Sequence, residues 1–427
     1  MWFGAFSSQD GYIKLEQKLK VQWKKNRNLK PSIILKKIDD EKKIEDGRVS
    51  FSGFEFHDAI VAIESMIDFP SIADDLDKHS IVKTTVWQVA KNPKIESCEF
   101  LSKLKNNILI ELNRRDNVYY LLTSLSMNVS YIRKIHLDDF VFRFYKDNFP
   151  NRFKGREDLI SKNRSNKETE SSGYVKVVVE LKAKSETIAA NKAMKALDLL
   201  RSLFCIQYNS LSELIGSDSE PINKIRLGEF HTLHNDSGNV FEDSFWYDPS
   251  YFKAKVHILE NEKNVIRNIR KIISIFSKFD ERYKNIIHDS LLRFVRAFDE
   301  RNQNIAVLRS WGALESLAAP NESNCDSVTI RCSFIFEEYE YHQQILEHLR
   351  EYRNRNVHAG QESAMAKTYG FQIQKYFKQL FIFHIRQQGN FKSIDEANKF
   401  LDLPADRDKI LHLQSIVEKS ISFRGYG

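Results

Sequence analysis

The stretch YRNRNVHAG, residues 352–360, decides how this chain folds and which chemistry it offers. It closes a segment whose apolar residues recur at helical spacing, and Gly360 stands where a left-handed helix C-cap is expected. Arg353 and His358 are five residues apart, so on an ideal helix they point about 140° away from each other. They converge only if the helix distorts or ends between them, or if a second copy of the chain supplies the partner. Arginine balances phosphate charge and histidine transfers protons near neutral pH, so the pair suits a phosphodiester.

This stretch also fits the motif of a known superfamily: an Arg with a polar residue after it, separated by four to six residues from a His. Residues 353–358 carry that pattern and resemble the HEPN superfamily. The flanks, in the family's order, are similar to its Apea-like subgroup. The matching segments are FVRA (294–297), LRSWGALESL (308–317), TIRCS (329–333) and HAG (358–360). The resemblance covers roughly residues 256–425, about two fifths of the chain.

The resemblance implies an all-α HEPN bundle at residues 256–427, acting as a metal-independent endoribonuclease that needs no cofactor and works as a homodimer. The 2′-OH of the RNA would attack the adjacent phosphorus, leaving a 2′,3′-cyclic phosphate and a 5′-OH. His358 would act as general acid or base, and Arg353 would stabilise the charged transition state. Asn354 would orient one of the pair, while Arg355 and Asn356 would contact neighbouring phosphate or sugar.

The same residues allow other interpretations. Cations at a helix C-terminus offset the macrodipole without any further function, and an Arg and a His can also bind phosphate without turnover. The superfamily includes inactive members, so a non-catalytic module for dimerisation or RNA binding is the second functional hypothesis. By family analogy alone, the active form implies a toxin or phage-defence effector with a protein trigger or antitoxin as partner.

Glu315 interrupts an otherwise apolar helical segment. A buried carboxylate usually needs a cationic partner, and Arg331 or Arg353 are the candidates. An exposed position at the edge of the helix explains Glu315 equally well.

After residue 255, helical periodicity replaces strand patterns. The predicted helices are 264–279, 281–301, 304–318, 327–337, 341–353, 363–386 and 406–420. Along residues 365–383, apolar side chains step by four and three, which favours a core face or a dimer seam over a ligand site.

Residues 1–255 predict a mixed α/β domain for sensing or for recognising RNA or a partner, which makes the whole chain α+β. Apolar residues alternate along 174–182, and turn residues between 225–234 and 240–246 predict a hairpin. Phe54 and Phe56 suggest a short strand. Residues 161–173 contain no apolar residue before Tyr174 and predict a loop or linker.

A basic and aromatic stretch from Arg143 leads to Arg152, Lys154 and Arg156. Such a stretch can guide RNA, although a strand followed by a solvated loop is the commoner explanation. The formal net charge of +7 permits an anionic partner, and equally describes an ordinary solvated surface.

Composition narrows the remaining classes of function. Four cysteines without CxxC spacing are too few for a disulfide scaffold, and no run is long enough to span a membrane, so we expect a cytoplasmic protein. The chain has no P-loop and no GxGxxG, which disfavours ATP or NAD chemistry. His231 and His234 fall on opposite faces of a predicted strand with no acidic or cysteine cluster nearby, so no metal site is predicted.

Overall fold

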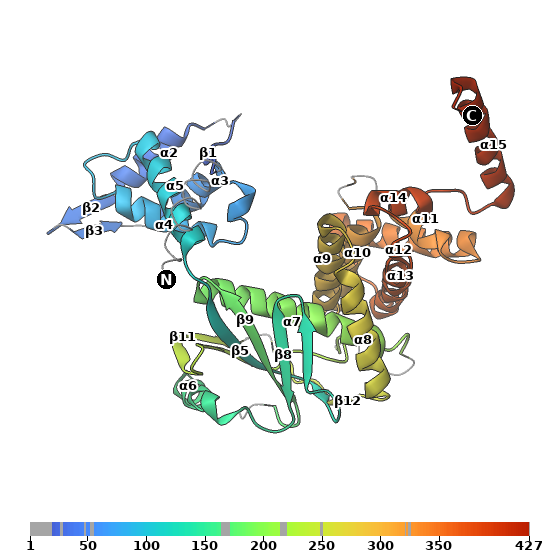
Figure 1. The fold of residues 1–427 in the computed structure, drawn as a ribbon, viewed down its shortest axis with the longest axis horizontal. Helices are drawn as coiled ribbons and strands as arrows, with labels where there is room; N and C mark the ends of the chain where they lie inside the picture. Colours follow the sequence, from blue (N-terminus) through green and yellow to red (C-terminus); the bar gives the residue numbers. More distant parts are fainter. Residues whose placement is uncertain are drawn as a thin grey trace, which may run out of the picture. The chain divides into compact units, whose positions relative to one another are not determined.

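The computed structural model describes residues 19–25, 29–46, 48–51, 55–163, 171–213, 220–247, 251–320, 322 and 326–426. The chain contains both helices and strands, in agreement with the predicted α+β class (Figure 1). It divides into two compact units. The first comprises residues 1–118 and 182–191, and the second comprises residues 119–181 and 192–427.

The first unit is a small helical body with two short β-ladders. Its helices are α2 (Pro31–Asp40), α3 (Glu55–Ser65), α4 (Lys78–Val89) and α5 (Ser97–Asn113). The strands are β1 (Gln22–Trp23) paired with β4 (Ile67–Asp68), and β2 (Lys42–Glu45) paired with β3 (Arg48–Phe51). Ile38, Ile63, Val86 and Leu104 are fully buried in one apolar core. The strand predicted around Phe56 is wrong, because Phe56 lies in α3 and turns its ring into this core; Phe54 lies outside the described residues.

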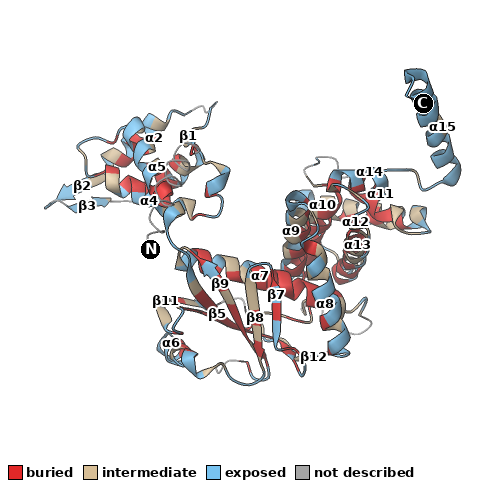
Figure 2. Ribbon diagram, in the orientation of Figure 1, coloured by how far each residue is buried: buried red, intermediate tan, exposed pale blue. Residues whose placement is uncertain are grey.

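The second unit is built on a six-stranded sheet with the order β11-β10-β5-β9-β8-β7. The strands are β5 (Asn117–Leu125), β7 (Lys134–Leu137), β8 (Phe140–Tyr145), β9 (Val175–Ala183), β10 (Phe230–His234) and β11 (Val240–Tyr247). The predicted strand at 174–182 is confirmed as β9, and the predicted hairpin is confirmed as the antiparallel pair β10–β11. A short parallel pair joins β12 (His257–Ile258) to β6 (Met127–Asn128). Figure 2 shows how completely the central strands are buried.

Two helices accompany the sheet. Helix α6 (Gly155–Asn163) packs on β11, so residues 161–163 of the predicted loop are its last turn, while 164–170 lie outside the described residues. Helix α7 (Glu186–Tyr208) follows β9 and buries most of its apolar side chains. The β10 histidines are both buried and bonded separately: His231 Nδ1 to the Thr123 hydroxyl at 2.7 Å, and His234 Nδ1 to the Gly238 carbonyl at 2.9 Å.

After β12 the described residues contain only helices (Figure 1). They are α8 (Glu262–Phe276), α9 (Glu281–Ala297), α10 (Gln303–Ala318), α11 (Asp326–Phe334), α12 (Tyr339–Ala359), α13 (Ala366–Arg386), α14 (Ile394–Leu401) and α15 (Arg407–Arg424). Seven of them correspond to predicted segments, and α14 was not predicted. Eight residues are too few for a reliable period, and α14 starts at a Ser393 cap that accepts the Glu396 N–H.

Helix α10 is the centre of this helical part. It packs against α9, α11, α12 and α13, and its Trp311, Leu314 and Leu317 are fully buried. Apolar residues lie on all sides of α10, which is the pattern of a helix enclosed by neighbours. The stripe predicted along α13 is largely core, since Ile373, Tyr376 and Leu380 are also buried. Helix α15 is the opposite case, because none of its residues is buried (Figure 2).

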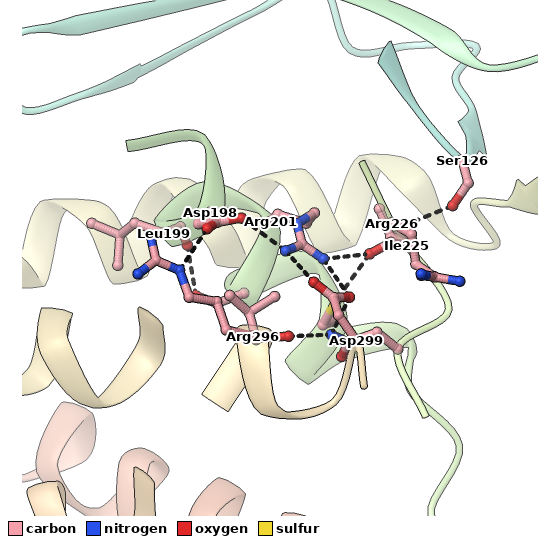
Figure 3. Close-up of polar contacts among 12 residues, drawn as sticks. Ser126, Asp198, Leu199, Arg201, Ile225, Arg226, Arg296 and Asp299 are labelled. Atoms are coloured by element: carbon pink, nitrogen blue, oxygen red, sulfur yellow. Dashed lines mark hydrogen bonds and ion pairs between the residues drawn. The ribbon is translucent and has the colours of Figure 1, made fainter. Parts of the chain in front are cut away.

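The helical part is fastened to α7 by buried polar groups (Figure 3). The guanidinium of Arg201, only 1% exposed, donates to both carboxylate oxygens of Asp299 at 2.8 and 2.6 Å and to Asp198 at 2.8 Å. Burial disfavours its charge, but Asp299 and Asp198 outweigh that cost and raise the pKa of Arg201 above its ordinary value. Asn223 adds a second link by donating to Asp299 at 2.9 Å.

A buried histidine makes the stability of this unit depend on pH. Nδ1 of His384, on α13, is 2.7 Å from the Tyr283 hydroxyl, and burial lowers the pKa of His384 to about 3. The unfolded ring titrates near pH 6.5, so below that pH the unfolded chain takes up a proton that the folded chain does not. The contribution of His384 to the free energy of unfolding is therefore complete above about pH 6.5. It decreases as the solution is acidified toward pH 3.

We predict that His384→Gln flattens the pH dependence of the unfolding free energy, measured by urea titration between pH 6 and 5. The slope should fall by about 1 kcal/mol per pH unit, because one proton no longer distinguishes the two states. His412→Gln, at an exposed position of α15, is the matched control and should keep the wild-type slope. An unchanged slope in His384→Gln would show that the ring is not neutral in the folded chain.

Candidate functional site

The motif lies on one unbroken helix. Helix α12 runs from Tyr339 to Ala359 without a break between Arg353 and His358, and Gly360 ends it with φ 62° and an N–H bond to the Asn356 carbonyl. The predicted left-handed C-cap is thus confirmed. Of the routes that would bring Arg353 and His358 together, a helix end between them is ruled out. On this helix they point about 140° apart and are displaced by about 7.5 Å along the axis.

Arg353 is held at the half-exposed surface of α12 by two partners. Its Nη1 donates to the Asn354 side-chain oxygen at 3.0 Å, and its Nη2 lies 3.5 Å from the Glu315 carboxylate on α10. Glu315 in turn accepts the indole N–H of Trp311 at 2.7 Å. Of the two cations predicted for Glu315, Arg353 is therefore the partner. The long distance and the partial exposure of both side chains make this a weak pair that a competing anion can replace.

The end of α12 is anchored to α10 by a second contact. The Tyr352 hydroxyl donates to the side-chain oxygen of Asn304, which also accepts the backbone N–H of Ser363 at 3.0 Å. Tyr352 is buried, which raises its pKa, and its ring packs 4.9 Å from Tyr369 on α13. One asparagine thus fixes both the helix end that carries the motif and the turn that follows.

The remaining motif residues face outward. His358 and Arg355 are exposed, and His358 makes no hydrogen bond with any residue in the described ranges. Asn356 is half-buried and donates to the Gln361 carbonyl at 2.6 Å, so it closes the C-cap turn. The structure therefore joins Arg353, Asn354 and Glu315 directly and leaves His358 free to meet another molecule.

Arg331 does not reach the motif. It is buried on α11, where it donates to both oxygens of Asp402 at 2.7 Å, to Glu322 at 2.7 Å and to the Ala318 carbonyl at 2.8 Å. These contacts tie the end of α10 and the C-cap of α14 to α11. Arg331 is not the partner of Glu315, and its buried side chain is not placed to contact RNA.

The three basic residues predicted to guide RNA have different surroundings. Arg156 is 1% exposed and makes a hydrogen bond with the Phe230 carbonyl, so the structure assigns it to the interior and not to an RNA-binding surface. Arg152 and Lys154 are exposed as predicted. The Arg152 guanidinium lies over the rings of Tyr120 and Phe153, at 4.2 and 4.5 Å.

A groove of about 820 Å³ runs between α9 and α10 and reaches Glu315. Its charged lining comprises three carboxylates, of Glu281, Asp289 and Glu315, and two guanidiniums, of Arg282 and Arg293. Both arginines have acidic partners, Asp395 and Asp289. Because negative charge is in excess, this groove does not favour a phosphate backbone.

Two residues that position the motif were not singled out from the sequence, Trp311 and Asn304. Trp311 is four residues before Glu315, a spacing that brings both side chains together on one helix face, so this signal was available. No sequence signal pairs Asn304 with Tyr352, 48 positions away.

Comparison of the chain with protein-family models, with curated proteins and with solved structures found no match. In the ranges that the structure describes, no helix has the length and apolar character needed to cross a membrane. Nor do three His, Cys, Asp or Glu side chains gather there in a way that could hold a metal ion.

We predict that Asn304→Ala loosens the turn after α12, because Ser363 and Tyr352 both lose their acceptor. One hydrogen bond stabilises by about 1 kcal/mol, so the Ser363 amide should exchange with deuterium roughly fivefold faster. Asn285→Ala, at an exposed position of α9, should leave that rate unchanged. Equal exchange rates in both variants would mean that other contacts hold the turn.

Proposed function

We propose that this protein is a metal-independent HEPN-type endoribonuclease whose active groups are Arg353 and His358, with Asn354 in support. One observation carries the proposal. At the end of α12, Arg353 is oriented by Asn354 and Glu315 while His358 stands exposed five residues on. This is the motif by which the sequence resembles the family, presented on a surface that a substrate can reach.

The chemistry follows from the two side chains. The 2′-oxygen of the RNA forms a bond to the adjacent phosphorus as its proton passes to a base, and the bond from phosphorus to the 5′-oxygen breaks as that oxygen takes up a proton. His358 serves one of these proton transfers. Arg353 exchanges its weak Glu315 contact for the phosphoryl oxygens and stabilises their charge in the transition state. DNA lacks the nucleophile and is not cut.

The geometry of α12 supports a site shared between two copies of the chain. Arg353 and His358 diverge on α12, so one scissile phosphate cannot contact both within one protomer. A homodimer places the Arg353 of one copy near the His358 of the other. Arg355 at the rim of this joint site and Arg152 and Lys154 on the sheet-containing part supply further phosphate contacts.

A second function has its own support. General bases are normally oriented by a third group, and His358 has none among the described residues. A non-catalytic module that binds RNA or mediates dimerisation would not need one. The family resemblance further suggests, by analogy alone, a toxin or phage-defence role in the cytoplasm with a protein trigger or antitoxin.

We expect Arg353→Ala and His358→Ala each to lower RNA cleavage by a hundredfold to ten-thousandfold, the usual effect of losing acid–base or charge stabilisation. Because both side chains are exposed or half-exposed, unfolding should change by no more than about 1 kcal/mol. Arg350→Ala on the same helix and His412→Ala on α15 are the matched controls. Cleavage is followed by the appearance of 2′,3′-cyclic phosphate ends.

A modified substrate and a chelator distinguish this mechanism from metal-dependent cleavage and from cleavage that does not use the 2′-OH. A single 2′-deoxy substitution at the cut site should abolish cleavage, whereas EDTA should have no effect. Cleavage of the deoxy substrate, loss of activity with EDTA, or full activity of His358→Ala would each contradict the mechanism. RNA binding without cleavage by the wild-type protein would favour the non-catalytic module.

The dimer makes a separate prediction. Light scattering should give twice the 50.1 kDa chain mass, and mixing Arg353→Ala chains with His358→Ala chains should restore cleavage. Restoration follows because the mixed dimer keeps one site with an intact Arg353 and an intact His358 from different copies. Two Arg353→Ala preparations mixed together are the control. A mixed dimer that forms but stays inactive would show that each motif works within its own chain.

A further inference from the structure

A small basic cavity lies in the second unit, away from the motif. It encloses about 220 Å³ where the segment before β10 meets the end of α9 and the start of α10. Four arginines line this cavity, which we call the arginine pocket: Arg226, Arg296, Arg301 and Arg309. The acidic residues in the lining are Asp299 and Glu300.

Both acidic residues of the arginine pocket already have cationic partners, and Figure 3 shows those of Asp299. Asp299 receives two hydrogen bonds from the buried Arg201, and Glu300 pairs with Arg309 at 2.9 Å. Arg296 extends to Asp198, 2.9 Å away, which also pairs with Arg201. The connected group contains the guanidiniums of Arg201, Arg226, Arg296, Arg301 and Arg309 and the carboxylates of Asp198, Asp299 and Glu300. Within this group of described residues, five positive charges face three negative charges, which is an excess of two positive charges.

The surplus charge belongs to Arg226 and Arg301. Among the described residues neither has an acidic partner. Both guanidiniums lie against the ring of Phe252, at 5.8 and 4.6 Å from its centre, and Arg226 also donates to the Phe252 carbonyl at 3.2 Å. Contact with an aromatic ring compensates a cation only in part. Two like charges held at one cavity repel each other until an anion joins them.

We infer that the arginine pocket binds a terminal phosphate monoester. A monoester carries about −1.5 to −2 charges at neutral pH, which matches the surplus of two. One guanidinium can donate two parallel hydrogen bonds to two phosphate oxygens. Arg226 and Arg301 together can therefore bind all the oxygens of one terminal phosphate. The volume falls below the roughly 300–1,000 Å³ of sites that enclose a whole small ligand. The pocket therefore takes the phosphate end of a molecule whose remainder stays outside.

A phosphodiester within an RNA chain fits less well. It carries one negative charge, one fewer than the excess in the pocket, and sugars extend from both sides of it, which leaves less room for it than for a terminal phosphate in a cavity of this size. The two sources of a terminal phosphate are a free nucleotide and a phosphorylated RNA end. This inference does not depend on the proposed nuclease function, since none of the pocket residues belongs to the motif.

The test is calorimetric titration of the full-length chain. Adenosine 5′-monophosphate and inorganic phosphate should bind, whereas adenosine should not, and the methyl ester of the nucleotide should bind about tenfold more weakly because it has one charge fewer. A 5′-phosphorylated oligoribonucleotide that binds more tightly than the nucleotide identifies an RNA end as the ligand, and the reverse identifies a free nucleotide.

Replacing Arg226 and Arg301 tests whether the phosphate binds in the arginine pocket. Arg226→Gln combined with Arg301→Gln should weaken binding of the nucleotide at least tenfold, while Arg293→Gln, an exposed α9 arginine outside the pocket, should not. Circular dichroism shows whether the double variant folds. If it does not, Arg301→Gln alone serves, because that side chain is exposed and should weaken binding severalfold. Equal binding of adenosine, equal affinity of the methyl ester, no binding of any phosphate probe at millimolar concentration, or unchanged affinity in the folded variants would overturn the inference.

Discussion

The structure of the second unit depends on the buried Arg201. A guanidinium removed from water costs several kcal/mol unless carboxylates and carbonyls surround it. Asp198 on its own helix, Asp299 after α9 and the Ile225 carbonyl supply that surrounding. These partners come from three separate parts of the chain. The Arg201 guanidinium therefore has all of them only when α7 and the helices after β12 are packed together.

Helix α10 contributes residues both to the arginine pocket and to the contacts that hold the end of α12. Arg309, near the middle of α10, lines the arginine pocket, and Glu315, six residues later, pairs with Arg353. Asn304, near the start of the helix, binds Tyr352 at the end of α12. Because α10 is enclosed by its neighbours, its packing fixes the positions of these three residues relative to one another.

Arg353 and His358 differ in how far the protein orients their side chains. Arg353 is positioned by protein groups before any ligand arrives, whereas His358 is not. A cation that stabilises transition-state charge gains most from such preorganisation. In the mechanism that we propose, His358 is oriented when a second chain or the substrate contacts it. Among the described residues, His358 has no hydrogen-bond partner.

The sequence by itself determined the elements: the alternation of β9, the β10–β11 hairpin, seven of the helices after residue 255, and the cap at Gly360. These depend on neighbours along the chain, through periodicity and φ preferences. For Glu315 the sequence left Arg331, Arg353 and an exposed edge position open. Only the tertiary structure decided that Arg156 and Arg331 are interior, that Asn304 holds Tyr352, and that Arg226 and Arg301 share a cavity. Burial and charge pairing join residues tens to hundreds of positions apart, and no local pattern encodes which of many similar arginines will meet a carboxylate.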